Sequence, residues 1–574
     1  MSQTVQEQQS GSLTATTRDD VEILRSVQGA PFLKRFLTYM NLTGPGWLQS
    51  ALTLGGGSLT SSLYLGVLAG FSMLWLQPLA MLLGIIMLAA LGYVTMSTGE
   101  RPLIAMNRHI NPVLGWSWAA ASLVASMVWA LPQYSLAVGV TQQNLLPGVV
   151  GADSAMGAST GRVIVTLIIL VVSTFVTWNY GRGGVGVRIY EAILKTVVAF
   201  IVLAFIGVGV RLVLTDSVQW GALIGGFIPD PRLIFRPAPG YDSLLAQVAT
   251  NAREYWSNLL VTQQQQVMAA GFSAAVGINM TFLFGYSLLR RRWGREFLDF
   301  QKFDLAMGML VPFMLATSCI IIAAASQFHT VPQPGFLGEE GAAPPVARQV
   351  NEYRNLLAGR IAFETGEDVS QLAPAELDAR IAQLDPADRR MAAVLVTRDA
   401  GDLARALRPI TGDFFANYLF GLGVLGMALS TVTLLMAVSG MVVCEAFGKP
   451  YGGWTFRLGA LMAASGALGP FIWSRASFWL AIPTSIIGLM LLPIAYVTFF
   501  LMMNRRSLLG DAMPTGRRRV IWNTLMVIAL VIVLSASFYM INQQTGLWGL
   551  GALALFLVAV GIAEVVRRKP AAAG

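Results

Sequence analysis

The sequence contains very few of the side chains that build disulfide frameworks and metal centres. Its 574 residues include two cysteines and two histidines. Cys319 and Cys444 both lie inside apolar stretches, which argues against a disulfide framework. His109 lies in a short polar loop and His329 at the end of an apolar stretch, so we expect both rings to be solvated. A histidine-based proton relay is therefore not expected.

Charge is also scarce, because charged residues make up 12% of the chain while hydrophobic residues make up 55%. The mean hydropathy is +0.62, and apolar runs of membrane-spanning length recur along the chain. The net charge of +9 comes from arginines that cluster between these runs. This placement is typical of membrane-flanking loops and argues against a nucleic-acid partner. We therefore predict an all-α polytopic protein of the lipid bilayer.

The apolar runs predict about twelve transmembrane helices. Arginine and lysine gather in alternate loops, and the positive-inside rule places those loops and both termini in the cytoplasm. We expect an integral inner (plasma) membrane protein with a polar cytoplasmic tail over residues 1–43 and no cleavable signal peptide. The predicted spans are 44–70, 74–97, 113–146, 162–180, 187–213, 256–290, 305–328, 412–445, 456–473, 477–503, 519–541 and 546–566.

A polar stretch over residues 329–411 interrupts the apolar pattern on the predicted outer side. It carries acids and arginines but no lysine, and helix-like patterns cover Pro374–Gln383 and Ala387–Val396. We interpret it as an extracytoplasmic insertion of small helices that caps the outer face. The alternative is a lid or a partner-binding surface, because long loops are often functional.

The first predicted span is interrupted by Gly55, Gly56, Gly57 and Ser58. Each glycine in a helix interior costs about 1 kcal/mol relative to alanine. In hydrocarbon, the freed backbone groups must also find partners, so irregular backbone is tolerated only inside protein or along a cavity. A broken spanning helix is therefore the best indicator in a sequence of a transporter's binding site.

A second interruption lies in the sixth span, where Gly271, Gly277 and Gly285 surround the polar Asn279. Its alternative interpretation is an unbroken, glycine-rich helix that packs closely on its neighbours. Breaks in spans one and six fit two inverted five-helix repeats, which is the LeuT-like arrangement. The predicted organisation is a first repeat over 44–213, an outer loop over 214–255, a second repeat over 256–503, and helices eleven and twelve with a short tail over 504–574.

Several short motifs recur in a characteristic order and spacing along the chain. They are the stretches 43–46, 97–101 with Leu103, 186–192, 220–222, 428–433, 492–493 and 505–510. Together these motifs resemble the NRAMP family of proton-coupled divalent metal transporters, and their order and spacing follow the family over residues 42–328 and 412–510. The resemblance implies the LeuT-like fold and transport of metal ions.

The chain departs from the family where the metal chemistry belongs. The family's Asp-Pro-Gly-Asn, whose Asp and Asn oxygens coordinate the ion, is replaced by Gly55, Gly56, Gly57 and Ser58. Transition-metal sites need carboxylate, imidazole or sulfur donors, so we expect neither a metal site nor proton coupling of the family kind. Met280 remains a soft donor, although methionine also fills gaps in apolar interfaces. The other family positions, a Met-Pro-His, a second histidine, a glutamate and a glutamine, align with Gly277-Ile278-Asn279, Phe284, Ser135 and Ser485.

Hydroxyls, an amide and backbone groups remain at the breaks. The half-helix that begins at Ser58 directs N–H groups and a positive dipole end inward, which suits an anion or carboxylate. The preceding half-helix presents carbonyls, which suit a small monovalent cation. Each hydroxyl has the alternative role of bonding to its own or a neighbouring helix. The candidate substrate-binding residues are Gly55, Gly56, Gly57, Ser58, Thr60, Ser135, Gly277, Asn279, Thr281 and Ser485, with Gln133 and Tyr134 as further lining candidates.

Charged residues are rare inside the predicted spans. Glu191 and Lys195 lie four residues apart in span five, as a helix-surface pair. Because ionisable groups inside a membrane are functional candidates, we treat this pair as a counter-ion or gate. Glu445 and Asp304 lie near span ends, where we expect them to contact water.

These patterns predict a secondary transporter that works by alternating access, with one bundle rocking about Gly55–Ser58 and Gly277–Asn279. Its expected cargo is a small anion or neutral solute rather than a transition metal. Two alternatives remain: a metal transporter of relaxed selectivity for a hydrated Mg²⁺-like ion, and a non-transporting sensor or scaffold. We expect no cofactor and no enzymatic activity, because no nucleophile–base or paired-carboxylate arrangement falls inside the spans. The oligomeric state is not indicated.

Overall fold

The computed structural model describes most of the chain, and every regular element in the described part is a helix. Glu191 and Lys195 lie outside the described residues, as does most of the predicted fifth span. The described residues are 14–27, 29–152, 154–180, 220–339, 344–369, 372–399, 401–403, 412, 414–473 and 477–568, with isolated residues 192, 196, 203, 207, 405 and 408.

The helices run in two groups along the chain. The first group is α2 (Thr14–Ser26), α3 (Phe32–Leu42), α4 (Pro45–Thr53), α5 (Gly56–Ala69), α6 (Leu76–Thr98), α7 (Pro102–Ala105), α8 (Pro112–Val140), which continues into a π-helical turn (Thr141–Leu145), α9 (Pro147–Val150), α10 (Gly157–Tyr180) and α12 (Trp220–Gly225). The second group is α13 (Asp242–Gln247), α14 (Thr250–Ala275), α15 (Ile278–Arg290), α16 (Phe300–Leu305), α17 (Val311–Phe328), α18 (Ala347–Thr365), α19 (Pro374–Gln383), α20 (Pro386–Leu395), α22 (Phe420–Ala446), α23 (Trp454–Ala463), α24 (Gly469–Ile472), α25 (Ala481–Met503), α26 (Arg506–Leu509) and α27 (Gly516–Arg568).

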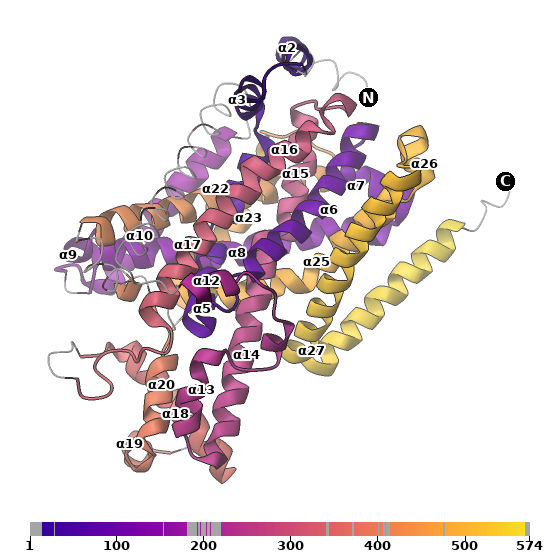
Figure 1. The fold of residues 1–574 in the computed structure, drawn as a ribbon. Coiled ribbons are helices and arrows are strands. Elements are labelled where there is room, and N and C mark those ends of the chain that lie inside the picture. The colour runs from indigo at the N-terminus through magenta and orange to yellow at the C-terminus, as the bar shows by residue number, and fades with distance from the viewer. Residues whose placement is uncertain are drawn as a thin grey trace.

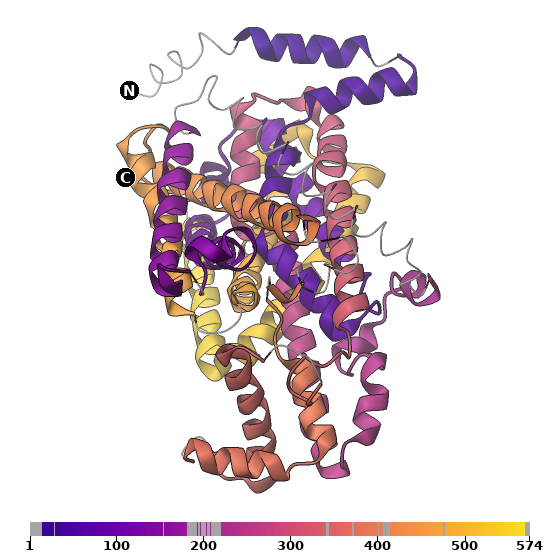
Figure 2. The ribbon, with the colours of Figure 1, turned by 90° about the vertical axis from the view of Figure 1, so that its left-hand side faces the viewer.

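The molecule has two ends that differ in their elements. Helices α2, α3 and α26 lie at one end, which we call the N-terminal face (Figure 1). Helices α13, α18, α19 and α20 lie at the opposite end, which we call the insertion face. The view turned by 90° keeps this division, with the insertion projecting away from the main bundle (Figure 2). The end of α27 lies toward the N-terminal face, where Arg567 donates to the carbonyl of His109 at 3.0 Å.

In the part of the chain that the structure describes, eleven of the twelve predicted spans lie on helices, and the fifth lies mostly outside it. Within the described residues, nine helices are long and apolar enough to cross a membrane, or ten if α4 and α5 count as one bent span. Helix α27 supplies two predicted spans, because Gly546 adopts φ 56° and ψ −141° and divides it. Only glycine adopts that backbone conformation without strain. An all-α polytopic membrane protein is therefore confirmed.

The bundle is held together by closely packed small residues. Helices α8 and α22 pack on each other, and α23 packs on α22. A Cβ added at Gly459 of α23 would lie 2.7 Å from the Cβ of Val443 and 3.1 Å from the Cα of Gly440, both in α22. Helices in lipid gain no hydrophobic driving force from pairing, so such close contact supplies the van der Waals energy that holds them together.

The insertion forms a helical body on the end of α14. The predicted helix over Pro374–Gln383 is found with those bounds, and the one over Ala387–Val396 is found at Pro386–Leu395. The fully buried Trp256 of α14 donates to Asp388 of α20 at 2.6 Å. Tyr255 of α14 donates to the carbonyl of Leu356 in α18 at 2.9 Å. The insertion is thus attached to the sixth span as well as to its own two ends.

Candidate functional site

The first predicted span is broken between α4 and α5, which meet at 53°. Gly55 is extended, with φ −99° and ψ −171°, whereas Gly56, Gly57 and Ser58 form the first turn of α5. The break is therefore shorter than the predicted Gly55–Ser58. The first turn of a helix donates no intrahelical N–H bonds, so α5 can begin directly at Gly56. The N–H of Gly56 instead donates to the Oε1 atom of Gln133 in α8 at 2.9 Å.

Close approach of neighbouring side chains explains two of the three glycines. A Cβ at Gly55 would lie 2.3 Å from Oγ1 of Thr431, and a Cβ at Gly56 would lie 1.9 Å from Cδ1 of Leu136. At Gly57, the nearest atom to an added Cβ would be the Cβ of Ala274 at 3.4 Å, an ordinary contact. A side chain at Gly55 or Gly56 would therefore require a neighbouring side chain of α22 or α8 to move.

The second break lies between α14 and α15. Val276 has φ −144° and ψ 101°, and Gly277 has φ −82° and ψ 161°. Asn279, which we expected within the break, is the second residue of α15. The N–H of Gly277 donates to the sulfur of Met280 at 3.2 Å. The predicted interruption of span six is present, but it lies two residues nearer the N-terminus than Asn279.

The two breaks cross each other at the centre of the bundle. The hydroxyl of Thr53 donates to the carbonyl of Ala275 at 3.2 Å, and the hydroxyl of Ser58 donates to that of Ala274 at 3.4 Å. The hydroxyl of Thr53 also lies 3.5 Å from the sulfur of Met280. Residues more than 200 positions apart in the sequence thus meet where the two broken spans cross.

Hydroxyl groups occupy the carbonyl ends of both broken helices. Thr53 and Ser58 donate to the last carbonyls of α14, as described above. In α4, the carbonyl of Ala51 accepts from the hydroxyls of Ser430 at 3.3 Å and Thr431 at 3.5 Å. A cation that bound these carbonyls would have to displace the hydroxyl donors.

The amino end of α15 carries a free donor instead. Asn279 is fully buried, and its Nδ2 atom has no hydrogen-bond partner among the described residues. Its Oδ1 atom accepts from the N–H of Met280 at 3.0 Å. The hydroxyl of Thr60, one turn into α5, is also buried without a partner in the described part of the chain. Because α5 and α15 both begin at the centre, their positive dipole ends converge there.

The remaining predicted residues divide between the crossing and its surroundings. Ser485 lies beside the crossing, with its hydroxyl 3.5 Å from a Cβ added at Gly57. Thr281 accepts from Nε1 of Trp118 at 2.9 Å. Ser135 donates to the carbonyl of Leu131 at 3.1 Å and lies against Gly469, away from Gly56. Thr281 and Ser135 thus take the helix-to-helix and within-helix roles that were their alternatives.

Sequence reasoning missed two residues at the crossing, Thr53 and Trp129. Trp129 of α8 would meet a Cβ added at Gly277 at 2.6 Å, and its Nε1 atom donates to the carbonyl of Thr484 at 3.1 Å. No sequence signal distinguished Thr53 or Trp129, because each resembles an ordinary residue of a packed span.

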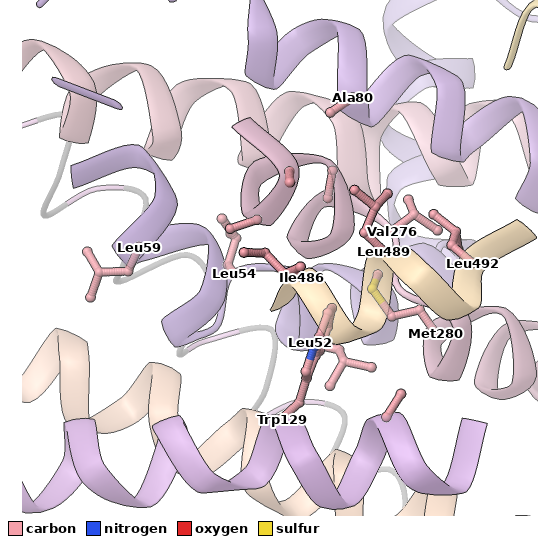
Figure 3. Close-up of a cluster of buried hydrophobic side chains, with 14 of the residues drawn as sticks. Leu52, Leu54, Leu59, Ala80, Trp129, Val276, Met280, Ile486, Leu489 and Leu492 are labelled. Atoms are coloured by element: carbon pink, nitrogen blue, oxygen red, sulfur yellow. The ribbon is translucent and has the colours of Figure 1, made fainter. Parts of the chain in front are cut away.

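Buried apolar side chains gather around the two breaks (Figure 3). They include Leu52, Leu54, Leu59, Val276, Met280, Ile486 and Leu489.

The N-terminal face holds two buried carboxylates that we expected to contact water. Asp304 is fully buried and accepts from the N–H groups of Gly44 at 2.8 Å and Gly46 at 2.7 Å. It therefore satisfies the amino end of α4, where a negative charge is favourable. Glu445 pairs with Arg101, and only 2% of its side chain is exposed. It also accepts from the hydroxyls of Tyr286 at 3.1 Å and Tyr451 at 2.5 Å.

His329, which we expected to be solvated, is half-buried. Its Nδ1 atom lies 3.0 Å from the carbonyl oxygen of Val67, and its ring packs edge-on against Tyr241 with centroids 5.3 Å apart. Burial lowers the pKa of His329 below its ordinary value and outweighs the opposing effect of the hydrogen bond to Val67. The neutral ring thus belongs to the packed end of α5.

Metal-binding side chains do not gather at the crossing. Within the described residues, no group of three or more His, Cys, Asp or Glu side chains is placed to hold a metal ion. The sulfur of Met280 already accepts one N–H group. The donor set of the crossing consists of amide, hydroxyl, thioether and backbone groups, which do not include the charged or imidazole ligands that transition metals prefer.

The fold and the crossing of two broken spans define a class: membrane proteins with the LeuT-like arrangement. The solved structure of a manganese transporter mutant from Eremococcus coleocola is similar in fold, with a TM-score of 0.50. The two share 14% sequence identity, and the match covers 94% of this chain and 95% of that chain. At this identity the likeness concerns the fold alone.

The family follows from the sequence match. The family model described as natural resistance-associated macrophage protein-like (Nramp) matches residues 46–342 and 390–543. The chain therefore belongs to the Nramp family, and the resemblance noted in its motifs is confirmed. The model leaves out residues 343–389, which include α18 and α19.

Curated relatives are similar over parts of their length. The divalent metal cation transporter MntH of Brucella suis biovar 1 (strain 1330) is 24% identical over 303 residues, which is 52% of this chain and 57% of that protein. The metal transporter Nramp4 of Arabidopsis thaliana is 27% identical over 167 residues, 28% of this chain and 29% of that protein. The chain thus spans about half the length, or less, of these relatives.

Proposed function

We propose that this protein is a secondary transporter that carries a small anion or neutral solute through the crossing of α4–α5 and α14–α15. One observation carries the proposal: hydroxyls occupy the carbonyl ends of the broken helices, while the Nδ2 donor of Asn279 is buried without a partner in the described part of the chain. Two helix amino ends add positive potential at the same point. Such a site favours a ligand that accepts hydrogen bonds.

The proposed mechanism is alternating access. The short breaks at Leu54–Gly55 and Val276–Gly277 are the points about which one bundle would rock. The crossing is filled by apolar side chains, so solute entry requires such a movement. The arginines of the N-terminal face, among them Arg101, Arg290 and Arg295, support a cytoplasmic position for that face and for both termini.

A second candidate function is transport of a divalent cation that keeps its water shell, such as Mg²⁺. The names of the relatives favour it, since they describe divalent cation and metal transporters. Oxygen atoms of Ser58 and Asn279 would then face bound water rather than the metal ion. Mg²⁺ loses its water shell reluctantly and usually keeps several waters, so these oxygens would contact the shell.

Thermal stabilisation of the full chain in nanodiscs tests both candidates. The probes are acetate, phosphate and chloride as anions, urea and glycerol as neutral solutes, and Mn²⁺ and Mg²⁺ as chlorides. We expect saturable stabilisation by an anion or neutral solute, confirmed by flux into proteoliposomes. Asn279→Asp should abolish it, because the substitution replaces the free donor with a carboxylate oxygen. Asn523→Asp in α27, remote from the crossing, is the matched control and should retain it.

The outcomes separate the candidates. Saturable Mn²⁺ flux in the unmodified protein would contradict the proposal. Mg²⁺ flux without Mn²⁺ selectivity would establish the second candidate instead. If none of these probes stabilises the protein or crosses the membrane, a sensor or scaffold becomes the better interpretation.

A further inference from the structure

A short segment of the insertion, residues 394–399, lies against the second half of the broken helix α5, on the side of the insertion face. Val394, Val396 and Arg398 are each at most 2% exposed. The hydroxyl of Tyr64 in α5 donates to the carbonyl of Arg398 at 2.7 Å. The ring of Tyr64 packs edge-on against Trp479, at the start of the tenth span, with centroids 4.7 Å apart. The segment therefore lies directly on the route from the crossing to the insertion face.

The same segment also contacts the end of α8. Gln143 donates to Oδ2 of Asp399 at 3.2 Å and accepts from the N–H of Gly401 at 2.9 Å. The N–H of Ser477 lies 3.5 Å from the same Asp399 oxygen. Three spans that are distant in sequence, the first, third and tenth, are thus joined through a few hydrogen bonds to one loop.

The body of the insertion holds this loop from the other side. Asp402 accepts from the N–H of Asp399 at 2.8 Å and from Nε2 of Gln333 at 2.9 Å. Thr397 donates to Glu352 of α18 at 2.6 Å. The buried Arg398 lies over the ring of Phe328, with 5.4 Å between Cζ and the ring centroid. Burial lowers the pKa of Arg398 to about 10, with the carboxylate of Asp402 acting in the opposite direction.

We propose that residues 394–399, together with the described residues 401–403, form a lid that closes the pathway at the insertion face and opens when α5 moves relative to α8. The lid rests on the proposed function, since it presumes a pathway. Opening breaks the contacts of Tyr64, Gln143 and Ser477, while the lid stays attached to α18 and, through the insertion body, to α14. Helices α18 and α19 lie in the stretch that the family model does not match, whereas the lid residues lie within the matched range 390–543.

A disulfide across the lid tests the proposal directly. A Cβ added at Gly401 would lie 3.8 Å from the Cβ of Gln143, and disulfides have a Cβ separation of about 3.8 Å. Gln143→Cys with Gly401→Cys is placed in a background with Cys319→Ala and Cys444→Ala. Thr60→Cys, one turn below Tyr64, then reports on access from the insertion side through labelling with a membrane-impermeant maleimide. Mass spectrometry quantifies labelling at position 60.

We expect labelling at position 60 to be at least tenfold slower with the disulfide oxidised than after reduction. Equal rates, or no labelling in the reduced protein, would overturn the lid. Because labelling requires no transported solute, its result is independent of the solute panel that tests the proposed function.

A single substitution tests the lid without a disulfide. Tyr64→Phe keeps the ring against Trp479 but removes the hydrogen bond to Arg398, so labelling at position 60 should rise several-fold. Tyr93→Phe is the matched control, because it removes a similar 2.7 Å bond to the carbonyl of Ala512 at the N-terminal face. An equal rise in both variants would show general loosening and contradict a lid.

Discussion

The three consecutive glycines of the first break have three different surroundings. An added Cβ would clash with Thr431 at Gly55 and with Leu136 at Gly56, but would make ordinary contacts at Gly57. Although the three glycines are adjacent in the sequence, they have different structural roles. Gly55 and Gly56 permit α5 to approach α22 and α8, whereas Gly57 leaves a small space beside Ser485.

This difference predicts opposite effects of one substitution at adjacent positions. Gly56→Ala should lower the free energy of unfolding by about 1–3 kcal/mol, because the methyl group must displace Leu136 or the accepting Gln133. Gly57→Ala should be neutral or stabilise α5 by up to about 1 kcal/mol, because alanine is the better helix former. Thermal unfolding in detergent measures both. If the two variants were destabilised to a similar extent, the conclusion that Gly56 but not Gly57 packs closely against α8 would be wrong.

His329 predicts a pH dependence at the insertion face. Its folded-state pKa is lowered by burial, so the unfolded chain takes up the proton at a higher pH than the folded protein. Its contribution to stability is then complete above the ordinary histidine pKa of about 6.5 and declines as the pH falls below it.

Melting temperatures at pH 7.5 and 5.5 check this prediction. The decrease on acidification should be about 2 °C smaller in His329→Gln than in the unmodified protein. His109→Gln alters the other histidine of the chain and serves as the control. A decrease that is the same in all three proteins would exclude His329 as its source.

At the scale of elements, α4 is a nine-residue half-helix whose amino end depends on one remote carboxylate. Asp304 accepts from the N–H groups of Gly44 and Gly46, while Pro45 between them has no N–H to satisfy. A Cβ at Gly46 would lie 2.2 Å from the backbone oxygen of Asp304. This arrangement explains the Thr-Gly-Pro-Gly motif. The turn at the start of α4 must leave room for the carboxylate of Asp304 and for the backbone of the seventh span.

Asp304→Asn should therefore loosen α4 specifically. The amide keeps only one acceptor oxygen and loses the charge at the helix amino end, at a cost of about 1–3 kcal/mol. Asp299→Asn is the matched control, because 96% of the Asp299 side chain is exposed, and it should change stability by less than about 0.5 kcal/mol. Thermal unfolding compares the two. Equal stability of both variants would show that Asp304 does not anchor α4.

At the scale of the whole molecule, both ends of the region around the breaks are covered. Asp304 and Glu445 hold the N-terminal face through α4, Arg101 and two tyrosines. The lid covers the insertion face, and apolar side chains fill the crossing. In the proposed transporter, a solute would pass only after one of these sets of contacts opens. The two faces use separate contacts, which is compatible with the proposed alternating access.

The spans, the insertion and the presence of two breaks followed from the sequence because they depend on local composition. A run of apolar residues of spanning length is a helix in lipid for energetic reasons that need no partner. Glycine clusters weaken that helix wherever they occur. The exact limits of the breaks did not follow, since they depend on Gln133 and Met280 accepting the first N–H groups.

The sequence by itself determined the family, the all-helical membrane fold and the residues near which the two broken spans would cross. Only the tertiary structure decided which groups meet there. Thr53 and Ser58 cap carbonyls on a helix more than 200 residues away, Asp304 and Glu445 are buried rather than wet, and Arg398 lies over α5. The physical reason is that hydrogen bonding and burial depend on two segments that meet in the fold, whereas a sequence pattern describes each segment by itself.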